Sequence, residues 1–108
     1  ADSTKTIIFD EVDAGIGGAA AAAVGERLSR LSKNAQVLVV THSPQVAARG
    51  NTHLRISKSI SSKGNVTHVD NLSGFVRNEE IARMLSGSKI TKEARAAAAS
   101  LLAGKERG

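Results

Sequence analysis

Two short apolar runs in the first half of the chain predict β-strands, one from Ile7 to Phe9 and one from Gln36 to Thr41. Neither run alternates with polar residues, which is typical of strands buried on both faces of a parallel sheet. Between them, residues 19–33 begin with five alanines and carry an apolar stripe at helical spacing. A strand, a helix and a strand in this order predict a βαβ unit with parallel strands and a right-handed crossover.

The pattern changes after the second strand. Ser43 and Pro44 are the residues expected at the start of a short helix, which we place at residues 45–49. Residues 52–57 then alternate between apolar and polar side chains, and residues 65–72 form a second candidate strand. The two segments predict an antiparallel hairpin on the edge of the sheet.

Two helices are predicted in the last third of the chain. Asn78 is the expected cap of the first, with Glu79 and Glu80 in its first turn and Gly87 at its end. The second is expected from about residue 91 to residue 103, after which the final residues should fray. The chain as a whole therefore predicts an α/β fold, with parallel core strands, a crossover helix, an edge hairpin and two C-terminal helices.

Composition limits how far this fold can stand alone. The chain has 108 residues, which allows one domain at most. Its hydrophobic share of 41% is rich in alanine and includes only two Phe, with no Trp or Tyr, so large core side chains are scarce. We therefore expect the chain to be the C-terminal piece of a larger protein.

The composition excludes some kinds of site and permits others. The absence of cysteine excludes disulfides and thiolate metal sites, and no apolar run approaches the ~20 residues that span a bilayer. The net charge of +5 permits binding to nucleic acid or to acidic partners. A non-catalytic basic module that binds DNA or a protein partner is therefore one hypothesis, although the basic residues are spread along the chain.

Candidate chemistry lies where the two predicted strands end. Asp10 and Glu11 follow the first strand and His42 follows the second. Because open α/β sheets bind ligands at the carboxyl ends of their strands, these side chains are candidates for one site. Phosphoryl transfer needs a magnesium ion, a positioned water and charge stabilisation, roles that suit Asp10, Glu11 and His42 in that order. Strands that simply end in polar residues are the competing interpretation.

Several motifs resemble those of ATP-binding-cassette ATPases. Residues 7–11 (Ile-Ile-Phe-Asp-Glu) resemble their Walker B segment, and residues 39–42 (Val-Val-Thr-His) resemble their switch-histidine strand. Residues 10–18, with 41–47 and 80–87, narrow the resemblance to the branch of the structural-maintenance-of-chromosomes (SMC) proteins and their relatives. The resemblance covers essentially all 108 residues. It implies the C-terminal lobe of a P-loop NTPase head.

The resemblance also implies roles for individual residues. Asp10 would be the magnesium-associated carboxylate, Glu11 the catalytic one and His42 the γ-phosphate switch. Ala14 to Gly17 would be the D-loop, which lies against a second head across a nucleotide sandwich, and Asp13, Gly15 and Gly17 would be cofactor-binding residues. The competing interpretation is a turn whose glycines only supply backbone freedom. Many cassette ATPases end this loop in Leu-Asp, whereas this chain has Ile16-Gly17, so no carboxylate role is transferred to those two positions.

Two motifs of the family do not occur in the chain. There is no Gly-x-x-x-x-Gly-Lys-Ser/Thr phosphate loop and no Leu-Ser-Gly-Gly signature. We therefore expect ATP and Mg²⁺ to need the missing N-terminal part of the head, and the chain alone to be inactive.

The resemblance implies partners and a cellular role as well. The partners would be the remainder of the same head with its coiled coil, a second head in a homodimer and DNA, but no membrane. The function would be that of an ATPase in DNA double-strand break repair by homologous recombination, in the cytoplasm and associated with the nucleoid. A transporter-type ATPase subunit fits the Walker B segment equally well, but residues 10–14 and the D-loop count against it.

Overall fold

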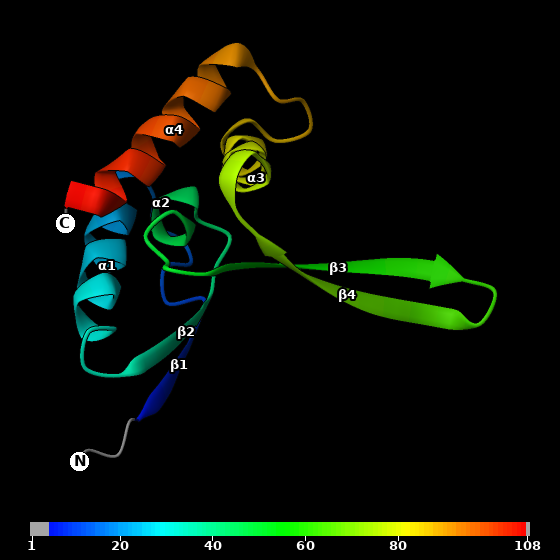
Figure 1. The fold of residues 1–108 in the computed structure, drawn as a ribbon, viewed down its shortest axis with the longest axis horizontal. Helices are drawn as coiled ribbons and strands as arrows, with labels where there is room; N and C mark the ends of the chain where they lie inside the picture. The colour runs from blue at the N-terminus through cyan, green and yellow to red at the C-terminus, as the bar shows by residue number, and fades with distance from the viewer. Residues whose placement is uncertain (1–4, 108) are drawn as a thin grey trace.

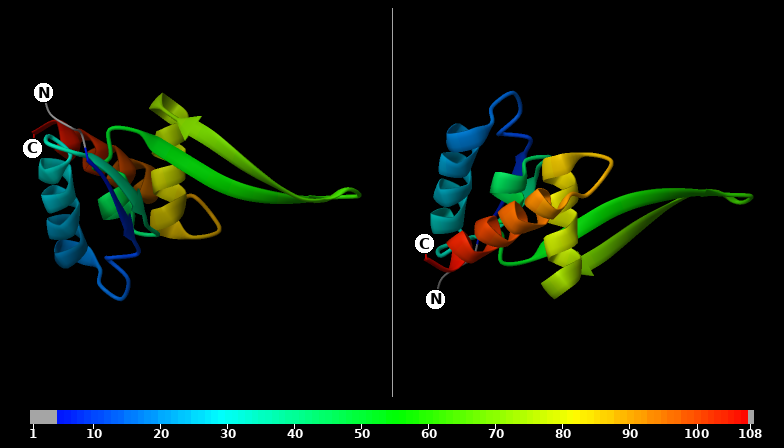
Figure 2. Two further views of the ribbon diagram at one scale, coloured as in Figure 1. Left: turned by 90° about the horizontal axis from the view of Figure 1, so that it is seen from below. Right: turned by 90° about the horizontal axis from the view of Figure 1, so that it is seen from above.

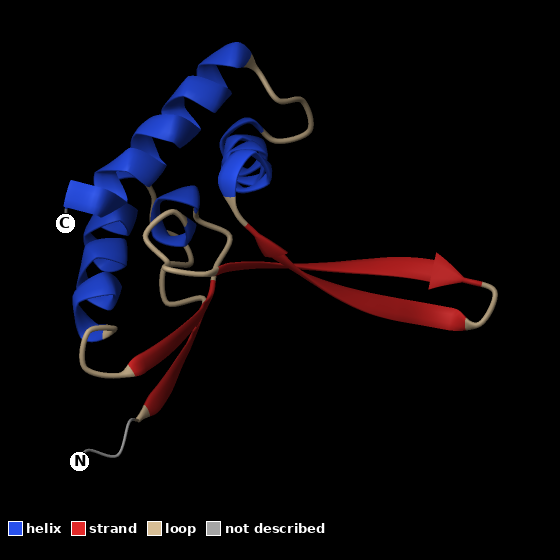
Figure 3. Cartoon of the chain, viewed as in Figure 1, coloured by secondary structure: helices blue, strands red, loops and turns tan. Residues whose placement is uncertain are grey.

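The computed structural model describes residues 5–107, and for 105–107 only the course of the backbone. The chain forms an α/β fold, as predicted (Figure 3). In chain order the elements are β1 (Thr6–Asp10), α1 (Gly18–Leu31), β2 (Gln36–Val40), α2 (Pro44–Ala47), β3 (His53–Ser61), β4 (Gly64–Leu72), α3 (Gly74–Ser86) and α4 (Lys92–Arg107).

The first three elements form the predicted βαβ unit. Strands β1 and β2 pair in parallel, in a register that runs from Thr6 opposite Gln36 to Asp10 opposite Val40. Helix α1 makes the crossover between them (Figure 1). This pairing places the carboxyl ends of both strands at the same edge of the sheet.

Burial on the two faces of this sheet is unequal. Phe9 lies on the face toward α1, where it lines a shallow apolar hollow with Val24 and Leu28. On the opposite face Ile8, Leu38 and Val40 are 67%, 45% and 53% exposed. The prediction of strands buried on both faces is therefore wrong for the described residues, because α1 covers one face and no described element covers the other.

Helices α1 and α2 pack closely at a glycine. A Cβ added at Gly25 would lie 3.0 Å from Arg49 Cγ, 3.1 Å from the Gln45 carbonyl oxygen and 3.3 Å from Val46 Cα. Ala21, one turn earlier on α1, is fully buried. Small side chains on α1 therefore let it approach α2, which follows directly from the loop after β2.

The main core lies between α2, α3 and α4 and is built largely from alanine. Its buried members are Ala48, Ile81, Ala82, Ala94 and Ala98. Larger side chains are only partly buried around it, at Met84, Leu85, Ile90, Leu101 and Leu102. The core is thus thin, as the composition predicts. None of the described helices is long and apolar enough to cross a membrane.

Strands β3 and β4 form a long antiparallel hairpin that extends away from the helices (Figures 1 and 2). Its register runs from His53 opposite Leu72 to Ser61 opposite Gly64, so both strands are longer than predicted. The hairpin is a separate two-stranded sheet and does not extend the parallel pair. Four large apolar side chains on one of its faces are exposed: Leu54, Ile56, Ile60 and Val69.

Helix α3 begins earlier than predicted. Ser73 is its N-cap residue, and Gly87, with φ of +84°, ends it at the predicted place. The prediction that Asn78 caps this helix is wrong, because the hairpin leads directly into it. Glu79 and Glu80 therefore lie inside the helix. The final helix, α4, passes the glycine at position 104 and continues to Arg107.

The two glutamates of α3 form ion pairs. Glu79 accepts from Arg95 of α4 at 2.8 Å, and Glu80, which is buried, accepts from Arg83 at 2.6 Å. The hydrogen bond from Arg83 lowers the pKa of Glu80, and Arg55 of the hairpin, 3.7 Å away, adds to this effect. These pairs connect α3 to α4 and to the base of the hairpin.

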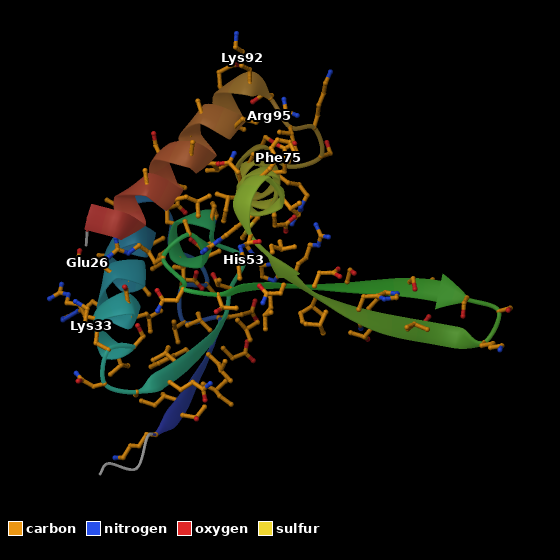
Figure 4. All side chains as sticks on the ribbon, in the orientation of Figure 1. Glu26, Lys33, His53, Phe75, Lys92 and Arg95 are labelled. Carbon is orange, nitrogen blue, oxygen red and sulfur yellow. The ribbon has the colours of Figure 1, made fainter. Side chains whose placement is uncertain are left out.

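Arg77 of α3 joins this helix to the end of α2. Its Nη2 donates to three backbone carbonyl oxygens at the end of α2, those of Ala47 (3.0 Å), Ala48 (3.5 Å) and Gly50 (2.7 Å). His53 lies at the same junction, where the hairpin meets the helices (Figure 4). Burial lowers the pKa of His53, and the nearby charge of Arg77 lowers it further.

Candidate functional site

The parallel pair brings two of the predicted site residues together. Glu11 follows the last residue of β1, and its N–H donates to the carbonyl oxygen of Val40 at 2.9 Å. His42 follows β2 by two residues. Glu11 Oε1 lies 3.7 Å from His42 Nε2, and both side chains are exposed, by 54% and 89%. The carboxylate and the imidazole therefore face each other in a position open to a ligand.

The backbone at Glu11 has an unusual conformation. Its φ of +53° makes it the one non-glycine residue with positive φ among residues 5–107. L-residues other than Asn and Asp rarely adopt this region, and such strain is concentrated at functional sites. This conformation turns the chain sharply between Asp10, which ends β1, and the acidic turn that follows.

Asp10 is exposed at the end of β1. Within the described part of the chain, no group of three or more His, Asp or Glu side chains forms a metal site. Mg²⁺ commonly takes only one or two carboxylates and completes its shell with water and substrate phosphates. Asp10 therefore fits a magnesium ion as one ligand, in a site that needs other donors.

Asp13 is placed differently from the other acids of this segment. It is only 5% exposed, and its Oδ2 accepts a hydrogen bond from Thr41 Oγ1. The same Thr41 oxygen accepts from the N–H of Ser43 at 2.9 Å. Sequence reasoning assigned no role to Thr41. The sequence feature that could have indicated a role is its position: Thr41 directly follows β2, next to the end of β1 where the acidic residues lie.

The glycine-rich turn after Asp13 is exposed and leads into α1. Gly15 has φ of +82°, which favours glycine. Gly17 has φ of −149°, which any residue can adopt, and a Cβ there would meet no described atom within 4 Å. The structure does not bring Gly15 and Gly17 into the Glu11–His42 pair. They form the outer end of the same loop.

Part of the positive charge is compensated within the fold. Four arginines pair with carboxylates: Arg30, Arg55, Arg83 and Arg95. Such pairs reduce the field that a basic surface presents to nucleic acid.

Comparisons with known proteins give close relatives of the sequence. No family model matches the chain. It is 58% identical to a protein of Deinococcus radiodurans over 85 residues, which is 79% of this chain and 15% of that protein. It is 52% identical to one of Xylella fastidiosa and 48% identical to one of Streptomyces coelicolor, in both cases over 94% of this chain and 18% of the relative. All three relatives are described as DNA repair protein RecN. The chain thus spans less than a fifth of the length of the curated relatives it matches.

A solved structure matches the fold. The similarity has a TM-score of 0.64 at 20% sequence identity, over 82% of this chain and 52% of the other. That structure comes from work on ATP-driven dimerization and DNA-stimulated activation of SMC ATPases. At this identity the similarity shows the fold, which is that of the C-terminal lobe of an SMC-type ATPase head.

Proposed function

Because the chain belongs to the RecN family of DNA repair proteins, we propose that it is the C-terminal portion of one ATPase head and supplies the hydrolytic half of a composite ATP site. The longer protein would act in DNA double-strand break repair by homologous recombination, in the cytoplasm at the nucleoid. The observation that carries the proposal is the Glu11–His42 pair, 3.7 Å apart at the ends of adjacent parallel strands.

The chemistry follows from the positions of the two side chains. The carboxylate of Glu11 orients the attacking water and accepts its proton. His42 would donate a hydrogen bond to the phosphoryl group under attack. Asp10, at the end of β1, would hold a magnesium ion, which supplies charge neutralisation on the phosphates when it is bound.

The remainder of the same head, with its coiled coil, is the first proposed partner. It would provide the phosphate loop that this sequence lacks. The exposed apolar face of β1 and β2 supports this, because Ile8, Leu38 and Val40 form a surface suited to burial against another layer. We propose that the remainder of the head covers this face and holds the nucleotide at the strand ends.

A second head is the other proposed partner, in a homodimer that acts on DNA. The turn that contains Gly15 and Gly17 would lie against the nucleotide bound to that head. The exposure of this turn supports the proposal. Gly17 also supports the proposal, because neither its backbone conformation nor its described neighbours require a glycine at this position. Close approach of another chain would require one.

The test uses a longer RecN-family polypeptide that includes the phosphate loop. We expect the wild-type polypeptide to hydrolyse ATP and the 108-residue chain alone to show no turnover. Glu11→Gln keeps the size of the side chain and removes its basicity. This variant should therefore bind nucleotide normally and lose turnover by at least about 100-fold. Undiminished turnover in Glu11→Gln would exclude the catalytic assignment.

A further inference from the structure

We propose that Asp13 and Thr41 act as a clamp that positions Glu11 and His42 relative to each other. The proposal rests on the function proposed above and adds two positioning residues to it. It starts from the burial of Asp13, which is 5% exposed although its neighbours in the turn are open to solvent. A buried carboxylate is costly unless it is hydrogen-bonded. Here the donor is Thr41 Oγ1.

The clamp connects the two loops that carry the candidate catalytic side chains. Asp13 lies two residues after Glu11, and Thr41 directly precedes His42. The hydroxyl group of Thr41 donates to Asp13 and accepts from the N–H of Ser43 at 2.9 Å. The backbone on both sides of His42 is therefore fixed through one oxygen atom.

The clamp is also connected to helix α2 through Ser43. Ser43 caps α2, because its Oγ accepts from the N–H of Val46 at 3.4 Å. Val46 is 5% exposed and packs where α1 approaches α2. A movement of the acidic turn would therefore have to break contacts that extend from Asp13 into the helical layer.

The direct contact between Glu11 and His42 cannot do this positioning itself. The two side chains are mainly exposed, and their 3.7 Å separation is longer than a hydrogen bond. Exposed ion pairs of this kind contribute little energy. Order in the pair must then come from the backbone, through the Glu11 N–H bond to Val40 on one side and the Asp13–Thr41 bond on the other.

The experiment measures ATP hydrolysis by the longer RecN-family polypeptide in four forms: wild type, Glu11→Gln, Thr41→Val and Thr41→Ser. Thr41→Val keeps the shape of the side chain and removes the hydroxyl. We expect kcat to fall on the order of 10-fold to 100-fold, because small displacements of catalytic groups have effects of this size. KM should stay within about twofold, since no nucleotide contact is removed. Thr41→Ser restores the hydroxyl and should restore kcat to within about threefold.

Two further variants separate positioning from general stability. Ser59→Ala removes a comparable hydroxyl hydrogen bond, to His68 on the exposed hairpin, and should leave kcat unchanged. Asp13→Ala combined with Thr41→Val should be no slower than Thr41→Val alone, because both changes break the same bond. If Thr41→Val does not fold, Thr41→Ala takes its place. It removes the same hydroxyl with a smaller side chain, so kcat should fall by a similar factor.

The outcomes distinguish the clamp from the proposed function. Loss of turnover in Glu11→Gln with full kcat in Thr41→Val would overturn the clamp alone. A higher KM at unchanged kcat would also overturn the clamp alone. The same holds if Thr41→Ser fails to restore kcat, or if the effects of the two changes multiply in the double variant. Turnover in Glu11→Gln, or none in wild type, would overturn the proposed function and the clamp with it.

Discussion

The N–H of Glu11 donates a 2.9 Å hydrogen bond to the carbonyl oxygen of Val40, one residue beyond the last register pair of β1 and β2. The sheet pairing therefore continues into the turn, although Glu11 itself has φ of +53°. This bond fixes the point from which the Glu11 side chain leaves the backbone. It places the carboxylate on the side of the sheet edge where His42 lies.

The left-handed conformation of Glu11 predicts a conflict between stability and activity. Glu11→Asn should raise the free energy of unfolding of the chain by about 1 kcal/mol, because asparagine adopts positive φ more readily than glutamate. The same change should abolish turnover in the longer polypeptide. Urea unfolding followed by circular dichroism measures the first effect. Asp10→Asn, within β1, is the control and should bring no gain; an equal gain there would show that charge and not backbone strain is responsible.

His42 is expected to affect the rate and not the stability. Its side chain is 89% exposed, so His42→Ala should leave the unfolding midpoint of the chain unchanged. In the longer polypeptide we expect kcat to fall by about 100-fold, as for other donors to developing charge in a transition state. His68→Ala is the matched control, because His68 bonds only to Ser59 on the exposed hairpin among the described contacts. Equal effects of the two changes would remove His42 from the site.

Arg77 should contribute strongly to the junction between α3 and the end of α2. Arg77→Met would leave three carbonyl oxygens, of Ala47, Ala48 and Gly50, without their charged donor. We expect a loss of about 2 to 3 kcal/mol in the free energy of unfolding. Arg77→Lys should recover only part of it, because an ammonium lacks the planar geometry of the guanidinium.

The control for Arg77 is Arg30→Met. Arg30 pairs with Glu26 on the exposed face of α1, and pairs of this kind contribute about 0.5 kcal/mol or less. Urea unfolding of both variants under one condition gives the comparison. A smaller loss for Arg77→Met than for Arg30→Met would contradict the role of the Arg77 bonds.

Gly25 is predicted to be essential for the approach of α1 to α2. Alanine raises helix propensity, but its Cβ at this position would lie 3.0 Å from Arg49 Cγ and 3.1 Å from the Gln45 carbonyl oxygen. Because one of these neighbours is backbone, relief requires the helices to separate, at a cost of about 1 to 3 kcal/mol. Gly17→Ala, with no described atom within 4 Å, should change stability by less than about 1 kcal/mol. A stabilised Gly25→Ala variant would show that the helices are free to shift.

Stability should fall in acid through Glu80. Its pKa is lowered in the folded state, mainly by the hydrogen bond from Arg83, so the folded protein binds this proton less readily than the unfolded chain does. The resulting stabilisation is complete above the ordinary pKa of 4.5 and is lost as the pH falls below it. The difference in free energy of unfolding between wild type and Glu80→Gln should therefore be largest near neutral pH and shrink below 4.5.

His53 provides a check on this assignment. Its pKa is also lowered, chiefly by burial, and its effect has the same sign but begins below pH 6.5. His53→Gln should therefore remove a loss of stability that starts at higher pH than the loss due to Glu80. Unfolding curves of both variants across the acid range separate the two windows. If neither substitution changed how the free energy of unfolding depends on pH in this range, both assignments would be contradicted.

Features that depend on a local sequence pattern were predictable. The continuous apolar runs and the alanine-rich segment between them gave the βαβ unit, and parallel strands then required Glu11 and His42 to share a sheet edge. Ser43 as the cap of α2 followed from its place before Pro44. The end of α3 followed from Gly87.

Contacts that depend on tertiary packing were not predictable. Asparagine is a common helix cap, but α3 begins at Gly74 with Ser73 as its N-cap, so Asn78 lies within the helix. The glutamates expected in its first turn lie further along the helix and form ion pairs. The bond between Asp13 and Thr41 joins residues 28 positions apart, and no local pattern signals it. The exposure of Ile8 also depends on which elements lie nearby and not on the strand's own residues.

The uncovered face of β1 and β2 also has a consequence for handling the chain in solution. Ile8, Leu38 and Val40 present an apolar surface on a two-stranded sheet whose outer edges pair with no other described strand. Salts such as sulfate, which are excluded from protein surfaces, favour the association of such faces. The isolated chain should therefore salt out at a lower ammonium sulfate concentration than a polypeptide in which this face is covered.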